Sequence, residues 1–461
     1  TSRFSNDNRW RFFPSGSVGW RISKKQFFSP LRNLVYNLKL RLSYGSLGNQ
    51  NVDSYYTFLR LVSIKDFAGF SFGGDLPSKY SSLGAPIASD LTWEKANQWN
   101  LGIDYSMFNN RFTLTADVYV RDTKDMLTAG IALPSVYGAD VPKMNTADLR
   151  TKGYELAVQW RDNFQLFGKR LDYNVGFNIS DYRAEITRYD NPEKSFAKDY
   201  YKGMRLGEIW GYVTDGLYAT DEEAAEYTKN LTFDSNFTGN LPTGWKAGDV
   251  KFVDLDGDGH IGKGGDTAND PGDRKVLGNS LPSLSYGITA GIRYCGFDVS
   301  AFFQGTGNHY WYPGGWVMSF WGSYGQPYSS FLPKDFLQNC WSEDNPDAYF
   351  PRPRSNISTG GYLRQACAND RYLQNIRYLR FKNLTVGYTL PENWTKKICL
   401  DNVRVYFSGE NLCYWSPLKK NTKYLDPERA FTRAENTDDS ALDNCYYPWQ
   451  KTFMFGLDIT F

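Results

Sequence analysis

Large hydrophobic residues recur at every second position over the last ten positions of the chain, 452–461. Five apolar residues share one face of the strand that this pattern predicts: Phe453, Phe455, Leu457, Ile459 and Phe461. Because successive side chains of a strand point to opposite faces, one face suits lipid and the other suits water. A strand of a soluble sandwich alternates in the same way, so this segment leaves both alternatives open.

The same alternation recurs along the chain and predicts eleven strands of about ten residues, the length that crosses a bilayer at a tilt. They are predicted at 15–22, 38–44, 99–105, 112–120, 154–160, 171–179, 286–294, 297–303, 384–390, 403–408 and 453–461.

The connections between these strands alternate between short and long. Short connections are predicted near 23–36, 109–110, 161–170, 295–296 and 391–400, and long ones near 48–97, 122–152, 188–283, 307–376 and 411–450. Transmembrane barrels have short periplasmic turns and long extracellular loops. We therefore predict an all-β fold, a transmembrane antiparallel β-barrel with long extracellular loops, in preference to a soluble sandwich.

Composition agrees with strands that cross a membrane. The 461 residues are 41% hydrophobic and 17% aromatic, with no apolar run near the roughly 18 residues of a membrane helix. Barrels place aromatic residues in girdles at both interfaces. A large extracellular sugar-binding β-protein is the alternative for the same numbers, and a net charge of +2 argues against a nucleic-acid partner.

Eight segments resemble, in order, the C-terminal half of the SusC-like TonB-dependent outer-membrane transporters of Bacteroidetes. They are LKLRLSYGSLGNQ (38–50), LTWEKANQWNLGIDY (91–105), RFTLTADVYVRDTKDML (111–127), NTADLRTKGYEL (145–156), GEIWGYVTDGLY (207–218), GDVKFVDLDGDGHI (248–261), RYLRFKNLTVGYTLP (377–391) and VRVYFSGENL (403–412).

The resemblance implies a barrel of twenty-two strands around an N-terminal plug, of which residues 1–461 form the C-terminal half. The N-terminal barrel half and the plug are then its partners, together with outer-membrane lipid. A SusD-like surface lipoprotein acts as a lid, and TonB contacts the N-terminal part. The implied function is import of an oligosaccharide, or of an oligopeptide, across the outer membrane. A passive barrel, a glycan-binding adhesin and a secreted calcium-dependent sandwich lectin remain as alternatives.

The segment DLDGDGHI has the spacing of a calcium-binding loop. Asp254, Asp256 and Asp258 occupy positions 1, 3 and 5, Gly259 allows the sharp turn, and the backbone carbonyl of His260 occupies position 7. Three converging carboxylates repel unless a hard cation neutralises them. A solvated Asp-Gly turn is the alternative.

The closing ligand departs from that spacing, because position 12 falls on Gly265. The resemblance suggests an insertion at 262–272, after which Asp273 closes the site, with Asp266 and Asp270 as competitors. The ion, Ca²⁺, is then a structural cofactor of the extracellular loop 188–283.

The sequence offers little for catalysis, since it has two histidines and no nucleophile or phosphate-binding motif. We expect that this protein is not an enzyme. Polar residues on the inner faces of the strands are expected to line the lumen: Arg41, Asp104, Asp117, Arg121, Glu155, Gln159, Arg293, Gln304, Arg404 and Asp458.

The loop 307–376 is rich in aromatic residues, whose flat faces stack on sugar rings. The candidate cargo contacts are His309, Trp311, Tyr312, Trp316 and Trp321. The alternative is that these side chains pack the loop on itself or against the lid.

Four cysteines fall in two predicted extracellular loops, and outside the cytoplasm disulfides persist. This placement predicts two bridges, Cys340 with Cys367 and Cys413 with Cys445. Cys295 and Cys399 lie singly at predicted periplasmic turns.

The terminal segment 451–461, which resembles the strand that marks barrels for insertion, is the predicted membrane insertion signal.

Overall fold

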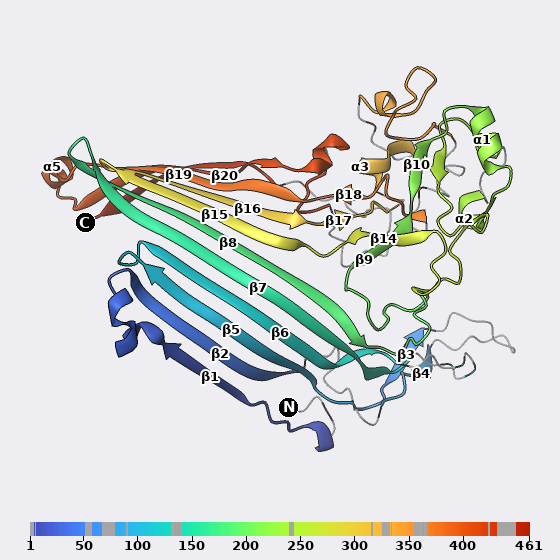
Figure 1. The fold of residues 1–461 in the computed structure, drawn as a ribbon, viewed down its shortest axis with the longest axis horizontal. Helices are drawn as coiled ribbons and strands as arrows, with labels where there is room; N and C mark the ends of the chain where they lie inside the picture. The colour runs from blue at the N-terminus through green and yellow to red at the C-terminus, as the bar shows by residue number, and fades with distance from the viewer. Residues whose placement is uncertain are drawn as a thin grey trace.

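The computed structural model describes most of the chain and contains one large antiparallel sheet of eleven strands (Figure 1). The described residues are 4, 6–50, 58–66, 79–88, 91–130, 134, 136, 138, 141–238, 244–314, 317–324, 332, 334–354, 363, 367–422, 425–430 and 449–461. The strand order is β1-β2-β5-β6-β7-β8-β15-β16-β19-β20-β21, so every strand pairs with the next one along the chain.

The strands of the large sheet confirm all eleven predicted strands. They are β1 (Ser15–Arg21), β2 (Val35–Asn49), β5 (Glu94–Met107), β6 (Phe112–Ala129), β7 (Lys143–Leu166), β8 (Lys169–Arg188), β15 (Ser283–Tyr294), β16 (Phe297–Asn308), β19 (Tyr378–Thr389), β20 (Asn402–Trp415) and β21 (Thr452–Thr460).

Smaller elements occupy the connections. Two-stranded sheets are formed by β3 (Val62–Asp66) with β4 (Lys79–Leu83), β9 (Glu208–Tyr212) with β14 (Arg274–Asn279), β10 (Thr214–Leu217) with β12 (Val250–Phe252), β11 (Thr232–Phe233) with β13 (His260–Ile261) and β17 (Tyr310–Trp311) with β18 (Gln374–Asn375). The helices are α1 (Asp221–Thr228), α2 (Ser235–Thr238), α3 (Met318–Trp321) and α5 (Glu392–Thr395), with 3₁₀ turns at η1 (Asn6–Asn8), η2 (Ile22–Lys24), η3 (Gln26–Leu31), η5 (Gly322–Tyr324), η6 (Leu337–Asn339), η8 (Lys396–Ile398) and η9 (Pro417–Lys420). Among the described residues, no helix has the length and apolar character needed to span a membrane.

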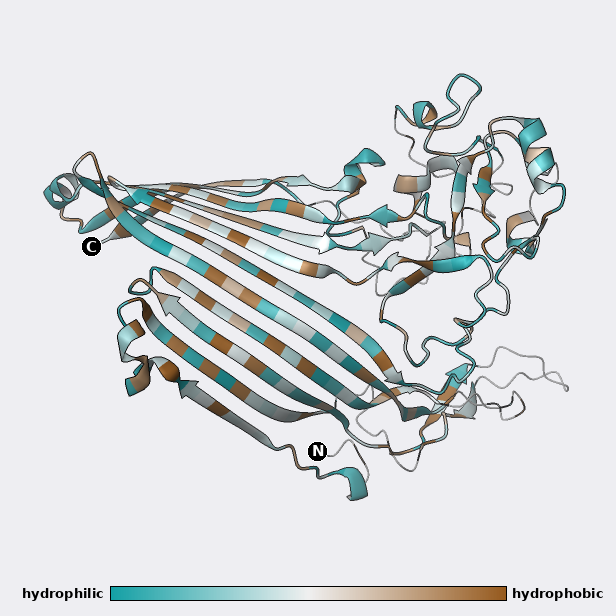
Figure 2. Ribbon diagram, in the orientation of Figure 1, coloured by the Kyte–Doolittle hydropathy of each residue, from teal (hydrophilic) through white to brown (hydrophobic). Residues whose placement is uncertain are grey.

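The two faces of the large sheet differ as the alternation predicts. Figure 2 shows brown and teal residues alternating along the strands. Apolar side chains on the outer face are exposed on strand after strand, among them Val18, Leu42, Leu101, Val118, Val175, Ile292, Val405 and Phe455. The pattern of one exposed apolar face and one polar face is typical of a barrel wall.

Short and long connections lie at opposite ends of the sheet (Figure 1). One prediction about the short ones is wrong: the connection near 161–170 is a two-residue turn, Phe167 and Gly168, between Leu166 and Lys169. Both turn residues have positive φ, 49° and 75°, which matches the mirror-image turns that join twisted strands. The polar residues before this turn therefore continue β7 instead of ending it.

Several strands run well beyond the length that a bilayer requires. β7 has 24 residues and β8 has 20, against the roughly ten that cross at a tilt. Both extend at the loop end of the sheet, where they hold the long connections away from the apolar band.

Three long connections fold together at the loop end, and we call this assembly the cap. It comprises the described residues between β8 and β15, between β16 and β19, and between β20 and β21. One buried hydrophobic cluster draws on all three connections, for example through Phe252, Trp321 and Leu418. Backbone hydrogen bonds join the first two connections, from Tyr212 N–H to Ala368 O (2.7 Å) and from Arg352 N–H to Gly248 O (2.8 Å).

Candidate functional site

Three carboxylates converge in the first connection of the cap. Asp254 and Asp256 lie in the turn between β12 and β13, and Asp273 directly precedes β14. Their ligand oxygens all lie within 4.8 Å of one another. The turn is held by Asp254, whose two carboxylate oxygens accept the N–H groups of Gly257 (2.7 Å) and Gly259 (3.0 Å).

Asp273 is the most deeply placed of the three, with none of its surface exposed. Its oxygens accept the N–H groups of Leu255 (2.6 Å) and Gly262 (2.8 Å), which ties both ends of the loop to one side chain. Burial raises the pKa of the Asp273 carboxyl above its ordinary value, and the charges of Asp256 and Asp254 act in the same direction. A cation at this point would offset both effects.

The other two predicted ligands sit differently. Asp258 lies outside the group of three, and its Oδ1 accepts the N–H of His260 (2.6 Å). The carbonyls of Gly259 and Ile261 accept N–H groups from the β11 side. Because carbonyls alternate along a strand, the carbonyl of His260 points away from β11. The His260 ring is held by Thr232 Oγ1 (2.7 Å) and Asp234 Oδ1 (3.3 Å).

The two competing carboxylates have other partners. Asp266 Oδ1 pairs with the guanidinium of Arg274 at 2.8 Å, and Asp270 Oδ2 accepts the N–H of Gly265 at 3.0 Å. The structure therefore groups Asp273, and neither competitor, with Asp254 and Asp256.

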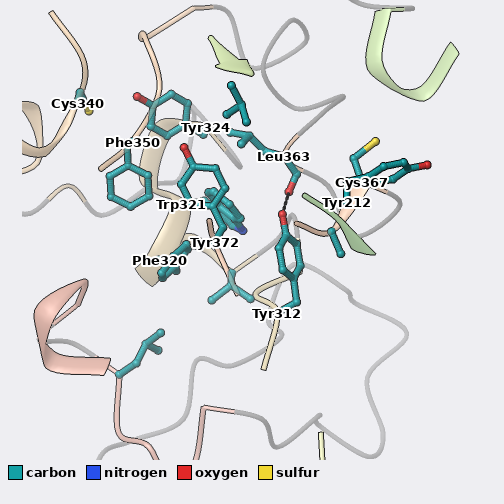
Figure 3. Packing of buried hydrophobic residues seen from close by; sticks show 14 of the residues in the cluster. Tyr212, Tyr312, Phe320, Trp321, Tyr324, Cys340, Phe350, Leu363, Cys367 and Tyr372 are labelled. Carbon is teal, nitrogen blue, oxygen red and sulfur yellow. Dashed lines mark hydrogen bonds between the residues drawn. The ribbon is translucent and has the colours of Figure 1, made fainter. Parts of the chain in front are cut away.

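The aromatic residues predicted to contact cargo are largely core residues of the cap (Figure 3). Trp321 is 1% exposed, packs edge to face on Phe320, and donates from Nε1 to Gly314 O at 2.9 Å. Tyr312 is 7% exposed and donates to Leu363 O at 3.1 Å. A sugar cannot stack on rings that are covered, so the prediction of cargo contact is wrong for these two residues and packing of the loop on itself is what occurs.

The remaining cargo candidates divide. His309 is also buried, and burial lowers the pKa of its imidazole, so it too is misassigned as a cargo contact. Trp311 is half-buried in β17 and packs against the same cluster. Trp316 lies outside the described residues.

The predicted bridge between Cys340 and Cys367 is wrong, because both are free thiols. Figure 3 shows them on opposite sides of the aromatic cluster, with the rings of Phe350, Trp321 and Tyr372 between them. Cys340 donates to Phe336 O at 3.3 Å. Cys413 is also a free thiol, and Cys445, its predicted partner, lies outside the described residues.

Charged residues predicted for the lumen form ion pairs across the inner face of the sheet. Arg41 lies 3.0 Å from Asp104 and 2.8 Å from Asp117, and it crosses β5 over Gly102. Near the other edge, Arg404 lies 2.7 Å from Asp298 and passes over Gly387 of the intervening β19. In each case a glycine leaves room for a guanidinium to join strands that are not neighbours.

The terminal strand has the predicted geometry. Arg404 also reaches Asp458 of β21 at 3.1 Å on the inner face. The five apolar residues of the insertion segment are all exposed on the outer face, from 42% for Ile459 to 87% for Phe461.

Sequence reasoning missed a buried group of charges where the cap meets the wall. The side chain of Arg380 in β19 is 2% exposed and lies 2.6 Å from both Asp426 and Glu428, while Lys382 lies 2.8 Å from Glu428. A register shift in β19 between Phe381 and Asn383 accompanies this contact. The alternation of β19 contained the signal for Arg380, but nothing in the sequence pointed to its partners, of which Asp426 is 46 residues away.

An open antiparallel sheet with an apolar outer face, a charged inner face and long loops at one end is part of a membrane barrel. The chain belongs to the family described as TonB dependent receptor-like, beta-barrel, whose model matches residues 1–412. Members of this family are receptors and transporters of the outer membrane, and the sheet is therefore a wall of an outer-membrane barrel.

Relatives align with the whole chain. TonB-dependent receptor P3 of Formosa agariphila is 29% identical, and TonB-dependent receptor SusC of Bacteroides thetaiotaomicron is 27% identical. The chain covers 43% and 41% of these proteins, so it spans less than half of their length. The RagAB peptide importer in its closed-closed state has the same fold, with a TM-score of 0.70 at 22% identity, covering 100% of this chain and 44% of that one.

Proposed function

We propose that the full-length protein imports an oligosaccharide, or an oligopeptide, across the outer membrane, and that this chain forms the C-terminal half of its barrel. One observation carries the proposal: an eleven-stranded sheet that is open along β1 and β21 aligns over its whole length with part of SusC. Unpaired backbone groups in lipid cost several kcal/mol each. An N-terminal half that supplies further strands would close both edges, and the insertion segment in β21 would mark the barrel for assembly.

The partners in this proposal follow from the family. A SusD-like lipoprotein would close over the cap, a plug would fill the lumen, and TonB would act through the N-terminal part. The likeness to RagAB supports a two-component importer.

The charged inner wall supports a polar cargo and does not select its class. Ion pairs such as Arg41 with Asp117 and Arg404 with Asp298 leave a polar lining for hydrated molecules. Since the rings of Tyr312 and Trp321 are buried, these two residues give no preference for sugars over peptides. The test therefore uses both oligosaccharides and oligopeptides.

The test is uptake of fluorescent oligosaccharides and oligopeptides by cells that carry the full-length gene and the gene of a SusD-like lid lipoprotein. Uptake of one class is expected, with loss when either TonB or the lid gene is deleted. Uptake that persists without TonB would identify a passive barrel and overturn the proposal. Binding without uptake would identify an adhesin.

We also infer that Ca²⁺ binds in the cap. The donor set fits this ion, because Asp254, Asp256 and Asp273 supply hard carboxylate oxygens at one point and His260 offers a carbonyl. Asp273 is fully buried, and its carboxylate accepts the backbone N–H groups of Leu255 and Gly262, which carry no full positive charge. Bound Ca²⁺ would supply that charge and do no redox or hydrolytic chemistry.

The role of the ion in this proposal is structural. Asp273 directly precedes β14, and β14 pairs with β9, whose Tyr212 belongs to the shared core. Holding Asp273 against Asp254 would therefore fix the first connection of the cap against the other two.

A further inference from the structure

Two pairs of like charges face each other across neighbouring strands on the outer face of the sheet. Lys95 of β5 lies opposite Lys124 of β6, and Lys152 of β7 lies opposite Arg183 of β8. Like charges directly opposite in a ladder repel and destabilise it. We therefore expect anions to lie close to each pair and to neutralise it.

The first pair is neutralised within the chain. Lys124 lies 3.0 Å from Asp148, and Lys95 lies 4.0 Å from Asp125. Arg188 adds a further contact to Asp148 at 2.8 Å, so the two carboxylates are shared in one network.

The second pair has no such anions in the part of the chain that the structure describes. Lys152 and Arg183 are both exposed, and neither forms an ion pair with a described residue. Three carboxylates lie nearby on the same face. The carboxylate of Asp122 accepts hydrogen bonds from Nε (2.6 Å) and Nη2 (3.1 Å) of Arg150. Glu185 lies opposite the same arginine in the ladder.

The third carboxylate, that of Asp181, is hydrogen-bonded to the backbone. Its Oδ1 accepts the N–H groups of Tyr182 (2.9 Å) and Leu284 (3.2 Å). The anion that would neutralise Lys152 and Arg183 is therefore expected from outside the protein.

The height of Lys152 and Arg183 on the barrel wall indicates where this anion comes from. Arg183 lies ten residues along β8 from Tyr173, whose hydroxyl accepts from Trp160 Nε1 in the aromatic row near the turn end. Ten residues of a strand tilted by about 40° rise about 25 Å, which is the height of the apolar band of a barrel. The pair therefore lies at the upper edge of the lipid-facing band, at the level of the lipid headgroups.

The neighbours in the same row agree with an interfacial position. Trp99 and Val120 continue the row of Lys152 and Arg183 across β5 and β6. Tryptophan at such a boundary places its apolar ring in lipid and its polar edge near the headgroups.

We propose that Lys152 and Arg183 bind a phosphate group of an outer-leaflet lipid. Charge complementarity selects an anion, and continuity with the lipid-facing face selects one that is carried on a lipid. The phosphate would accept hydrogen bonds from the Lys152 ammonium and the Arg183 guanidinium, and it would replace their repulsion by attraction.

The test compares the full-length protein with its K152Q/R183Q variant in nanodiscs that contain lipid A, either phosphorylated or with its phosphates removed. Native mass spectrometry of the extracted protein measures retained lipid. Retention of phosphorylated lipid A is expected to fall about 25-fold, since each basic residue near an anionic membrane contributes about five-fold. A matched control, K169Q/K397Q, removes two exposed lysines at the turn end and is expected to retain lipid as the wild type does.

Thermal stability provides a second readout that does not depend on retention. In phosphate-free lipid the K152Q/R183Q variant is expected to be more stable than the wild type, because the repulsion is gone; in phosphorylated lipid A the order is expected to reverse. Equal retention by wild type and variant, or the same order of stability in both lipids, would overturn the proposal. Displacement of the lipid by millimolar inorganic phosphate would show a free-phosphate site and overturn the assignment to lipid.

Discussion

The ring of Tyr406 on β20 lies directly against the backbone of Gly456, its partner in the ladder on β21. A methyl group at position 456 would overlap the ring carbons and hydroxyl of Tyr406. We therefore expect Gly456→Ala to destabilise the closing strand by about 1–3 kcal/mol, the usual cost of overpacking. The fraction of full-length barrel that migrates in the folded form before heating measures this effect. Gly16→Ala in β1 is the matched control, because no atom lies within 4 Å of the added methyl position.

The buried charges between β19 and the cap give a second prediction. Arg380→Met leaves Asp426 buried without its cation and is expected to cost about 3–5 kcal/mol. The additional change Asp426→Leu is expected to restore most of that stability, because the charges of Arg380 and Asp426 are then both absent and Glu428 keeps its pair with Lys382. Thermal unfolding of the full-length protein measures both variants.

An exposed ion pair serves as the control for this experiment. Glu392 and Lys396 lie 2.9 Å apart with side chains 75% and 66% exposed, so Glu392→Gln is expected to change stability by less than about 1 kcal/mol. A loss for Glu392→Gln as large as that for Arg380→Met would contradict the buried role of Arg380.

The thiols are expected to differ sharply in reactivity. Cys295 and Cys399 are exposed and should react with maleimide in the native protein, whereas Cys340 and Cys367 should react only after denaturation. Failure of Cys340 and Cys367 to react in denatured, unreduced protein would show that they are bridged after all.

Burial also gives the cap a pH dependence of known sign. It raises the pKa of the Cys367 thiol from 9.0 to about 12. The unfolded chain therefore releases this proton at a lower pH than the folded cap does, and stability is expected to fall as pH rises from about 9 toward 12. Thermal melts of wild type and Cys367→Ala over that range measure the slope, which should be smaller in the variant.

Calcium binding is expected to depend on Asp273 and not on its neighbour Asp270. Asp273→Asn should weaken Ca²⁺ binding by about ten- to hundred-fold, because the number of charged ligands sets the affinity of such loops. Asp270→Asn should leave binding unchanged, since Asp270 lies outside the group of three carboxylates. Titration calorimetry on the full-length protein measures both; equal losses in the two variants would contradict the site.

The strands were predictable from sequence because lipid and water impose opposite requirements on alternate residues. The alternation that predicts 154–160 weakens from Lys143 to Gly153 of β7, where the outer face leaves the apolar band and carries Lys152 and Arg150. The alternation therefore predicts the centre of each strand and does not predict its extension beyond the membrane. The same reasoning ended β7 too early at the polar residues before Phe167.

The cap was far less predictable. The aromatic residues of 307–376 are candidate cargo contacts in the sequence because flat rings stack on sugars, and the sequence does not show which rings are covered. Trp321 is covered by rings of its own connection, such as Phe350 and Tyr372. The same cluster also contains Phe252 and Leu418, which are distant in sequence and come from the other two connections. Asp273 was reached through resemblance, because its distance from Asp254 does not follow the regular loop spacing.

The shared core of the cap has a consequence for the order of biogenesis. Its side chains come from segments that span Tyr212 to Ala430, separated by four strands of the sheet, β15, β16, β19 and β20. Such a core is complete only when all three segments have reached the same side of the membrane, because each of them contributes buried residues to it. Closure of the shared core would therefore be a late step of assembly, after the strands that carry the three connections are in place.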